Sequence, residues 1–204
     1  MATPTARGPL LAAHQAAGAT LQMLDGWQTA AKYPDEPARG AHALVDLSHR
    51  SVHEVNGPGT GLLLQSSLGR DLPVRTIHQH GQATVYRLSA TRAIWFGDTP
   101  ALPDAIDVTG GWATLALCGP EAAGILGKVT AIDLRSTTFP IDACCQGPMF
   151  GVLILFGRFD NRFKLHMASD SAQFIWDVLL DAGREFDLRP AGTAFLDNQS
   201  SSVI

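Results

Sequence analysis

The sequence predicts an α+β domain with antiparallel sheets, built from two copies of one strand–turn–helix unit and therefore pseudo-twofold symmetric. The main observation is an internal repeat, because residues 56–72 match residues 118–134 at a constant offset. Each copy follows a similar short strand, at 45–48 and at 106–109. The identical pairs are Gly57/Gly119, Pro58/Pro120, Leu64/Leu126, Asp71/Asp133 and Leu72/Leu134.

Size and composition agree with one globular domain. The chain has 204 residues, of which 46% are hydrophobic and 17% are charged. A chain of this length can bury roughly 70% of the surface that its unfolded form exposes, so it needs no disulfide or metal for stability. The net charge of −4 creates no field that attracts phosphate backbones, and we expect no nucleic-acid partner.

Cysteine usage and hydropathy indicate a cytoplasmic protein. Cys118, Cys144 and Cys145 form no C-x-x-C pair, so we expect reduced thiols and neither a disulfide framework nor a zinc site. Residues 1–9 lack the pattern of a signal peptide. The longest strongly apolar run, 149–156, is far shorter than the ~20 residues that span a bilayer, and we expect no membrane insertion.

The first 40 residues read as an extended leader that lies along the domain or along a partner. They are rich in Ala, Gly, Thr and Pro, with one short helix expected over Leu21–Ala31 and ended by Pro34–Pro37. The domain itself is expected over residues 41–196, with repeat halves at about 43–100 and 104–192. Residues 197–204 are expected to form a flexible tail.

The first half is expected to begin with a strand over Ala43–Val55, where apolar and polar residues interleave. Asn56-Gly-Pro58 ends this strand, and Pro58 favours the first turn of a helix that continues to Leu68. Further strands are expected over Thr84–Phe96 and, in the second half, Val108–Leu117.

Near the end of the chain the pattern predicts a hairpin of 150–158 with 162–167, and then a helix. Ser169 or Ser171 would cap this helix and Gly183 would end it in a left-handed conformation. Its expected buried stripe is Phe174, Ile175, Val178, Leu179 and Ala182. Trp95, Trp112 and Trp176 are expected in the core.

Two catalytic or ligand-binding motifs are excluded. Gly57–Gly61 suggests a phosphate loop, but no Gly-Lys-Ser/Thr follows and the second copy lacks two of its glycines. Asp46, Ser48 and His49 suggest a triad, but Ser48 and His49 are strand neighbours that point to opposite faces.

The histidines form pairs rather than a metal site. The spacing of His49 with His53, and of His78 with His80, places each pair on one strand face. A metal ion needs three or four converging ligands, so surface or interface histidines are the preferred interpretation.

The motifs resemble those of a known family. Ala43–His49 followed by Asn56–Pro58 resembles the opening of the aminomethyltransferase-like, folate-binding proteins, of which the glycine cleavage T protein is the best-known example. Gly111–Pro120 resembles the family's second repeat, and residues 177–192 resemble the end of its catalytic domain. Phe139-Pro140, Gly151–Leu155 and Trp176 resemble more closely the gamma subunits of heterotetrameric sarcosine oxidases.

This resemblance implies a non-catalytic accessory subunit of an oxidoreductase in one-carbon metabolism. Larger, alpha- and beta-like flavoprotein subunits would be its partners and would carry FAD, FMN, NAD and tetrahydrofolate, while this chain alone binds no cofactor. An alternative is an independent tetrahydrofolate-binding or aminomethyltransferase-like protein, with its acid from Asp46, Asp98 or Asp107. An interaction module outside one-carbon metabolism is a third interpretation.

The candidate interface residues are Trp27, His49, Arg158 and Arg162. Trp27 lies in the expected leader, where a large aromatic side chain can anchor an interface. Arg158 and Arg162, together with Asp160 and Asn161, cluster at the expected hairpin tip. They could contact a partner or the glutamate tail of folate, or simply form a solvated turn.

Overall fold

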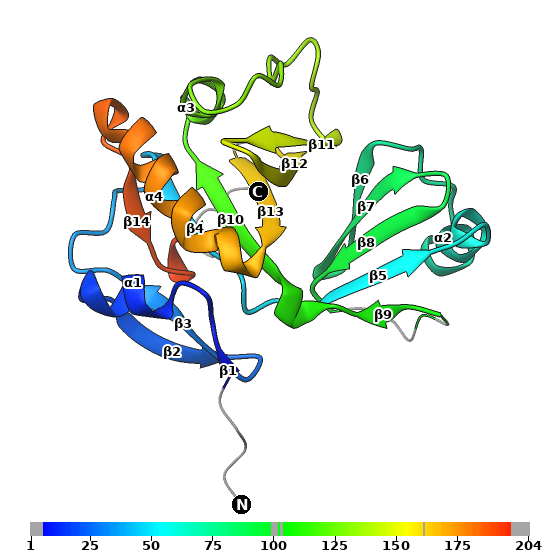
Figure 1. Cartoon of the computed structure of the whole chain (residues 1–204), viewed down its shortest axis with the longest axis horizontal. Helices are drawn as coiled ribbons and strands as arrows, with labels where there is room; N and C mark the ends of the chain where they lie inside the picture. The colour runs from blue at the N-terminus through cyan, green and yellow to red at the C-terminus, as the bar shows by residue number, and fades with distance from the viewer. Residues whose placement is uncertain (1–5, 99–101, 103, 161, 197–204) are drawn as a thin grey trace, which may run out of the picture.

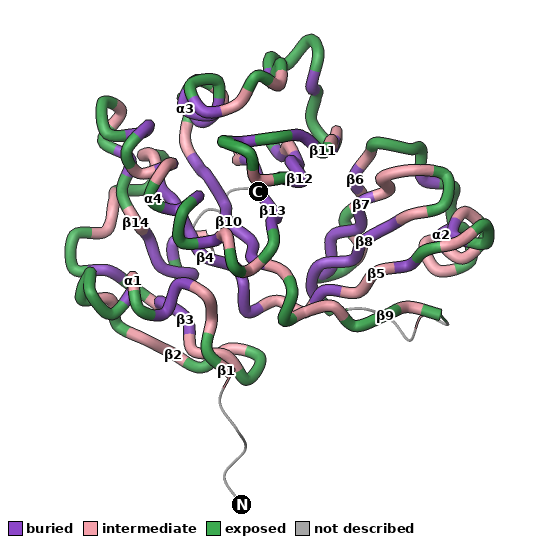
Figure 2. Tube along the Cα trace, in the orientation of Figure 1, coloured by how far each residue is buried: buried purple, intermediate pink, exposed green. Residues whose placement is uncertain are grey.

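A computed structural model describes residues 6–98, 102, 104–160 and 162–196 of the chain (Figure 1). The expected tail, 197–204, lies outside the described residues. Two large sheets and one small N-terminal sheet make up the fold, and the buried residues concentrate in the sheets and on the inner sides of the helices (Figure 2).

The first sheet is antiparallel throughout. Its strands, in spatial order, are β6 (Thr76–His80), β7 (Ala83–Ser89), β8 (Arg92–Phe96), β5 (Val52–Asn56) and β9 (Ile106–Asp107). Helix α2 (Thr60–Leu68) covers the face that carries Val85 and Trp95. The opposite face, with Tyr86 and Phe96, packs against the second sheet.

The second sheet is antiparallel except for its last strand. Its order is β11 (Cys144–Met149), β12 (Val152–Arg158), β13 (Arg162–Ala168), β10 (Trp112–Cys118), β4 (Ala43–Asp46) and β14 (Arg189–Ala191). Helices α3 (Ala122–Gly127) and α4 (Ala172–Ala182) cover one of its faces and close the largest apolar core. The predicted hairpin of β12 with β13 is confirmed.

The predicted duplication is confirmed by strand order, and the two copies exchange one strand. β6, β7, β8 and β5 take the same places in the first sheet as β11, β12, β13 and β10 take in the second. β4 precedes β5 in the chain but pairs with β10, whereas β9 precedes β10 but pairs with β5. Each large sheet therefore contains a strand from the other half of the chain.

The Gly-Pro turns of the repeat have the same conformation. Gly57 and Gly119 have φ values of 134° and 114°, which only glycine adopts easily. In each copy the third residue after this glycine donates its backbone N–H to the glycine carbonyl, at 3.2 Å from Thr60 and from Ala122. The predicted helix after Pro58 is confirmed as α2.

Where the chain crosses between the two sheets, the two copies again share one arrangement. Asp46 Oδ1 accepts from the backbone N–H and the hydroxyl of Ser48 (2.9 and 2.5 Å), and Asp107 Oδ1 accepts from the same groups of Thr109 (2.9 and 2.6 Å). The Ser48 hydroxyl then accepts from the N–H of Thr114 (3.1 Å), and that of Thr109 accepts from the N–H of Val52 (2.9 Å). Each turn thus binds a central strand of the other copy.

Two segments that were each predicted to be one strand form two strands in the structure. Residues 84–96 form the β7–β8 hairpin, with a turn at Ala90-Thr91. Residues 43–55 form β4 and β5, which belong to different sheets. In residues 43–55 the apolar alternation lapses over the polar stretch 48–51, and in residues 84–96 it lapses at Thr91-Arg92, so each break falls where the apolar pattern is interrupted.

The N-terminal segment is folded, and the prediction of an extended leader is wrong for residues 6–32. β1 (Ala6–Arg7), β2 (Thr20–Leu24) and β3 (Trp27–Lys32) form a sheet in the order β1-β3-β2, with α1 (Leu11–Ala16) beside it. The helix predicted over Leu21–Ala31 is a hairpin, because Asp25-Gly26 forms a two-residue turn with positive φ at both positions. Leu10 is fully buried in the main core.

Helix α4 is present as predicted, but its ends and buried face differ. The buried residues are Ala172, Ile175, Trp176, Leu179 and Ala182. Phe174 is exposed because the helix is rotated so that Trp176 faces the core. Ser171 binds Asp170 Oδ1 and makes no side-chain cap hydrogen bond. Gly183 has φ −87° and is not left-handed; a Cβ there would instead overlap the side chain of Leu188.

Gly192 tests whether the N-terminal sheet is integral to the domain. A Cβ at this position would overlap the backbone carbonyl of Ala31 on β3. We expect Gly192→Ala to lower the free energy of unfolding by about 1–3 kcal/mol, because β3 must move away. Gly127→Ala, which meets open space at the end of α3, should change it by less than about 0.5 kcal/mol. Denaturant unfolding of both variants measures this, and equal stability would contradict the prediction.

Candidate functional site

Polar side chains connect the two large sheets where β13 faces β7. Lys164 Nζ donates to Thr84 Oγ1 at 3.1 Å, and His166 Nε2 lies 2.8 Å from the hydroxyl of Tyr86. Lys164 and His166 lie two residues apart on β13, so both project from the same face. His166 is completely buried, stacks on Phe96, and has its pKa pushed well below the usual value by burial and then by Lys164.

A small polar cavity of about 170 Å³ opens at one end of this contact between the sheets. Both large sheets and the turns next to them contribute residues. Its lining consists of Leu47, Arg50, Gln79, Gly81, Gln82, Thr84, Arg162, Lys164 and Leu196. Among these described residues are three cationic side chains, Arg50, Arg162 and Lys164, and no Asp or Glu. We call this space the cationic cavity.

The electrostatics of this cavity are unusual. Lys164 is only 8% exposed, and burial, together with the charges of Arg50 and Arg162, lowers its pKa to about 7. Its ammonium also lies 4.6 Å from the centre of the Phe159 ring. The Nε atoms of Arg50 and Arg162 are buried without a hydrogen-bond partner. Such a site can stabilise a negative charge, or it can hold a lysine that is partly neutral near pH 7.

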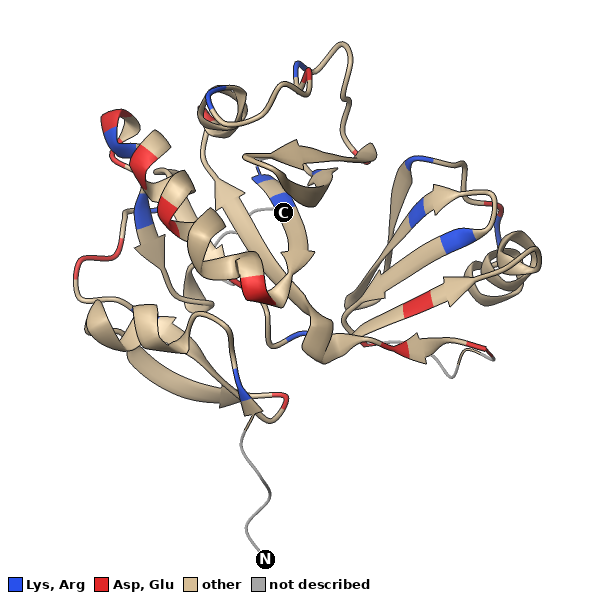
Figure 3. Cartoon of the chain, viewed as in Figure 1, with Lys and Arg blue, Asp and Glu red and all other residues tan. Residues whose placement is uncertain are grey.

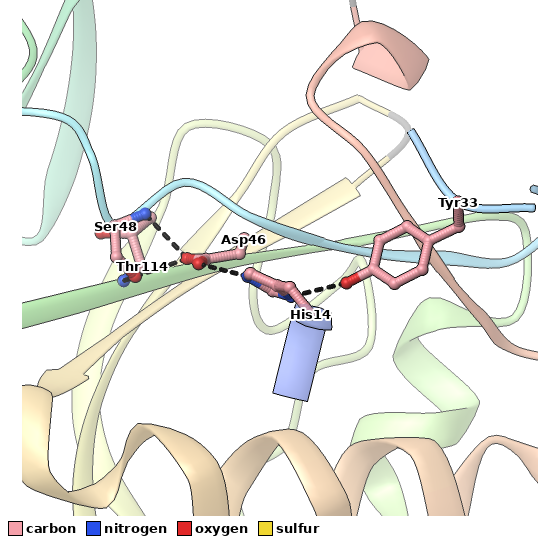
Figure 4. A network of polar contacts seen from close by, with 5 residues as sticks. All are labelled: His14, Tyr33, Asp46, Ser48 and Thr114. Carbon is pink, nitrogen blue, oxygen red and sulfur yellow. Dashed lines mark hydrogen bonds and ion pairs between the residues drawn. The ribbon is translucent and has the colours of Figure 1, made fainter. Parts of the chain in front are cut away.

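A second buried polar network joins the N-terminal segment to the first chain crossing (Figure 4). His14 Nε2 lies 2.9 Å from Asp46 Oδ2, and the hydroxyl of Tyr33 lies 2.6 Å from His14 Nδ1. Asp46 also accepts from Ser48, which binds the N–H of Thr114. Burial and the charge of Asp46 raise the pKa of Tyr33. All five residues are at most 5% exposed, so the network is closed to a substrate and we interpret it as structural.

The sequence candidates are distributed over several places, except that Arg158 and Arg162 line one pocket of about 330 Å³ together with Asp160. Trp27 is half-buried on β3, next to Ala6 of β1. His49 is 7% exposed, so little of its side chain can reach a partner, and burial together with Arg50 lowers its pKa. Arg158 Nη1 donates to the carbonyls of Leu134 (2.8 Å) and Phe139, which stabilises a loop.

Arg162 is the one sequence candidate that lines the cationic cavity, while Asn161 lies outside the described residues. Sequence reasoning missed Arg50 and Lys164. Lys164 could have been found, because Arg162, Lys164 and His166 alternate with Phe163, Leu165 and Met167 on one strand. Three basic residues on one face of a central strand indicate a polar interior.

The histidine pairs are only partly as predicted. His49 lies in the turn before β5 and does not share a strand with His53, since the chain changes sheets between them. His78 and His80 do share a face of β6, with ring centres 6.5 Å apart. Trp95 and Trp176 are buried as predicted, whereas Trp112 is half-buried.

Two absences hold for the described part of the chain. No three His, Cys, Asp or Glu residues gather where they could ligate a metal ion. No helix there has the length and hydropathy needed to cross a bilayer.

A family assignment follows from the sequence. The profile of the GCVT N-terminal domain matches residues 82–199, more than half of the chain. The chain belongs to this family. Aminomethyltransferases of Saccharopolyspora erythraea and Streptomyces avermitilis are 26% and 27% identical to it, over 93% and 91% of its residues. This GCVT-domain chain spans only 61% and 59% of those two relatives.

Two solved structures share the fold of this GCVT-domain chain. The glycine cleavage system aminomethyltransferase T of Bartonella henselae superposes with a TM-score of 0.75 at 19% identity, covering 95% of this chain and 61% of that one. A chain of the heterotetrameric sarcosine oxidase of Corynebacterium sp. U-96, solved with pyrrole 2-carboxylate, gives 0.68 at 20% identity. That match covers 89% of this chain and 96% of the sarcosine oxidase chain. The predicted α+β, aminomethyltransferase-like fold is confirmed.

The buried network predicts a stability effect of His14. Its removal leaves the buried Asp46 carboxylate without one of its partners, so we expect His14→Ala to cost about 2–4 kcal/mol. It should also make residues 6–32 more susceptible to limited proteolysis. His78→Ala on the edge strand β6 is the control and should cost less than about 0.5 kcal/mol. Equal effects of the two variants would show that the network contributes nothing.

The depressed pKa of Lys164 predicts a pH dependence of stability. The unfolded lysine titrates near 10.5 and the folded one near 7, so between these pH values the unfolded state binds more protons and stability rises with pH. At pH 6 we expect Lys164→Met to be more stable than the wild type by a few kcal/mol, and this advantage should shrink towards pH 10. Thermal unfolding in chloride buffers measures it. A stability difference between Lys164→Met and the wild type that does not vary with pH would show that the pKa of Lys164 is not lowered in the folded protein.

Proposed function

We propose that this chain is an accessory, gamma-like subunit of a multi-subunit flavin-dependent oxidase or dehydrogenase of sarcosine or another N-methyl amine, coupled to one-carbon transfer to tetrahydrofolate. One observation carries the proposal. The chain and a chain of heterotetrameric sarcosine oxidase match over nearly the full length of both, whereas it spans six-tenths of the aminomethyltransferases. In this proposal the larger subunits bind FAD, FMN, NAD and tetrahydrofolate, and this chain binds none of them by itself.

Exposed aromatic residues support a role as a subunit. Phe150 and Phe174 are 62% and 48% exposed, and both line a groove of about 450 Å³ over α4. Phe150 forms the β11–β12 turn with φ 47°, a conformation that a bulky residue rarely adopts. Exposed aromatic side chains beside a groove are typical of protein–protein contacts.

The rim of this groove indicates the chemistry of the partner. Asp177 and Asp181 of α4 line it together with Lys128, and Asp181 pairs with Arg184 at 2.8 Å. Figure 3 shows acidic residues along this helix. A larger subunit that covers the groove would present apolar side chains, with a lysine or arginine opposite Asp177. Trp27 and Arg162 remain candidate contacts of the same complex.

Co-expression tests the proposal. The chain is expressed together with the proteins that its neighbouring genes encode, purified through an affinity tag on one of them, sized by gel filtration and examined for bound flavin. We expect a stable complex, and we expect Phe150→Ser with Phe174→Ser to weaken it at least about tenfold. Leu62→Ser is the control, because Leu62 is 74% exposed, more than either phenylalanine, but lies on α2 at the other end of the molecule. A chain that stays monomeric beside the flavoproteins contradicts the proposal.

The second candidate is an independent tetrahydrofolate-binding or aminomethyltransferase-like protein. It is favoured by the names of the curated relatives, which are aminomethyltransferases. Two of its three proposed acids are engaged, since Asp46 binds His14 and Ser48 and Asp107 binds Thr109. Calorimetry of the isolated chain with tetrahydrofolate discriminates between the candidates. A dissociation constant in the micromolar range, about −8 kcal/mol, would favour this candidate over the accessory subunit.

A further inference from the structure

The cationic cavity between the large sheets has an excess of positive charge. Arg50, Arg162 and Lys164 line it together, and its described lining contains no carboxylate. Seven ion pairs form in the described part of the chain, and none of them includes these three residues. Cations that lie this close repel one another unless an anion is held among them.

The same side chains leave buried hydrogen-bond donors unused. The Nε atoms of Arg50 and Arg162 are buried and have no partner, although Arg50 Nη1 reaches the carbonyl of Gln82 at 3.4 Å. Lys164 is more than nine-tenths buried, and Thr84 Oγ1 accepts from its ammonium. A buried donor without a partner destabilises the free protein, so a ligand that accepts several hydrogen bonds would stabilise this region.

The size of the cavity limits what it can hold. Its volume of about 170 Å³ is below the range of roughly 300–1,000 Å³ that is typical of sites for larger organic ligands. It suits one tetrahedral or planar oxyanion with a few waters, given that a water takes up about 30 Å³ of liquid. Arginine guanidinium groups match the oxygens of such anions in pairs.

We infer that this cavity is a binding site for a compact oxyanion, a sulfate, phosphate or carboxylate group held by Arg50, Arg162 and Lys164. The chemistry is the same whether the oxyanion is free or is the end group of a larger molecule that remains outside the cavity. The inference is independent of the proposed accessory role, because it rests on the charges and donors of this chain alone.

Proton uptake is a specific signature of this site. An anion beside Lys164 stabilises the ammonium form and raises a pKa that lies at about 7 in the free protein. The other titratable groups nearby are Arg50 and Arg162, His166 on the same strand, and His49 beside Arg50. Both histidines have lowered pKa values and are neutral at pH 8, and the arginines stay charged, so uptake at pH 8 reports Lys164.

Calorimetric titration of the full chain with sodium sulfate at pH 8 tests the inference. Sulfate does not titrate near this pH, so runs in two buffers of different ionisation enthalpy measure protons taken up by the protein. We expect saturable one-site binding with uptake of part of a proton. Lys164→Met should lower the affinity by about tenfold or more and abolish the uptake. Arg162→Gln should also weaken binding, which covers the case in which the lysine variant does not fold.

Lys32→Met is the matched control, because Lys32 is exposed at the end of β3 and does not line the cavity. It should bind sulfate as the wild type does. No saturable binding to the wild type, or equal binding by the Lys164 and Lys32 variants, would overturn the inference.

Competition identifies the source of the oxyanion. Sulfate titrations are repeated in the presence of 5-formyltetrahydrofolate, which ends in a glutamate, and of the same compound without that glutamate. Competition by the first compound alone assigns the site to the end of a folate-like molecule, and it would favour the independent tetrahydrofolate-binding candidate over the accessory subunit. Competition by neither assigns it to a free anion, and both outcomes support an oxyanion site.

Discussion

The exchange of β4 and β9 between the two large sheets is the constraint on which the rest of this structure depends. The chain must cross from one sheet to the other inside each repeat, and every backbone N–H that becomes buried there needs an acceptor. Asp46 with Ser48, and Asp107 with Thr109, supply these acceptors twice with nearly the same distances. Because each hydroxyl also binds the N–H of a central strand of the other copy, the two crossings fix the sheets relative to each other.

The N-terminal segment makes the two copies different. α1 and β3 bring His14 and Tyr33 onto Asp46, which is buried, whereas Asp107 remains exposed to solvent. Two copies of one turn therefore have different electrostatic surroundings. The cationic cavity is similarly one-sided, since Lys164 of β13 corresponds to the buried, apolar Ile94 of β8, although Arg162 corresponds to another arginine, Arg92.

Local features were predictable from the sequence, and pairings between distant segments were not. The Gly57 and Gly119 turns, α2, α4 and the β12–β13 hairpin all depend on residues within a few positions of one another. The exchange of β4 and β9 depends on distant partners. β4, for example, pairs with β10, which lies about 70 residues further along the chain, and no hydrophobic periodicity encodes such a pairing. Asp25-Gly26 carried a hairpin signal that the alanine-rich composition around it outweighed.

The candidate site shows the same division. Arg162 could be found from its position in the hairpin, and the basic face of β13 was visible in the sequence. Arg50 could not be placed beside it, because that proximity arises only when the turn after β4 meets β13 in three dimensions. The groove beside Phe150 and Phe174 could not be predicted from the sequence either. Recognising it requires knowing that α4 buries Trp176 and leaves Phe174 exposed.

The exchanged strands also bear on how such a molecule can arise. A chain with one repeat alone would hold its first strand outside its own sheet, and a second copy would be the natural acceptor for that strand. Two copies would then close around a twofold axis as an intertwined homodimer. The present polypeptide has the topology of that homodimer joined end to end. Covalent linkage converts an encounter that depends on protein concentration into an intramolecular folding step, and it frees the two halves to diverge in sequence.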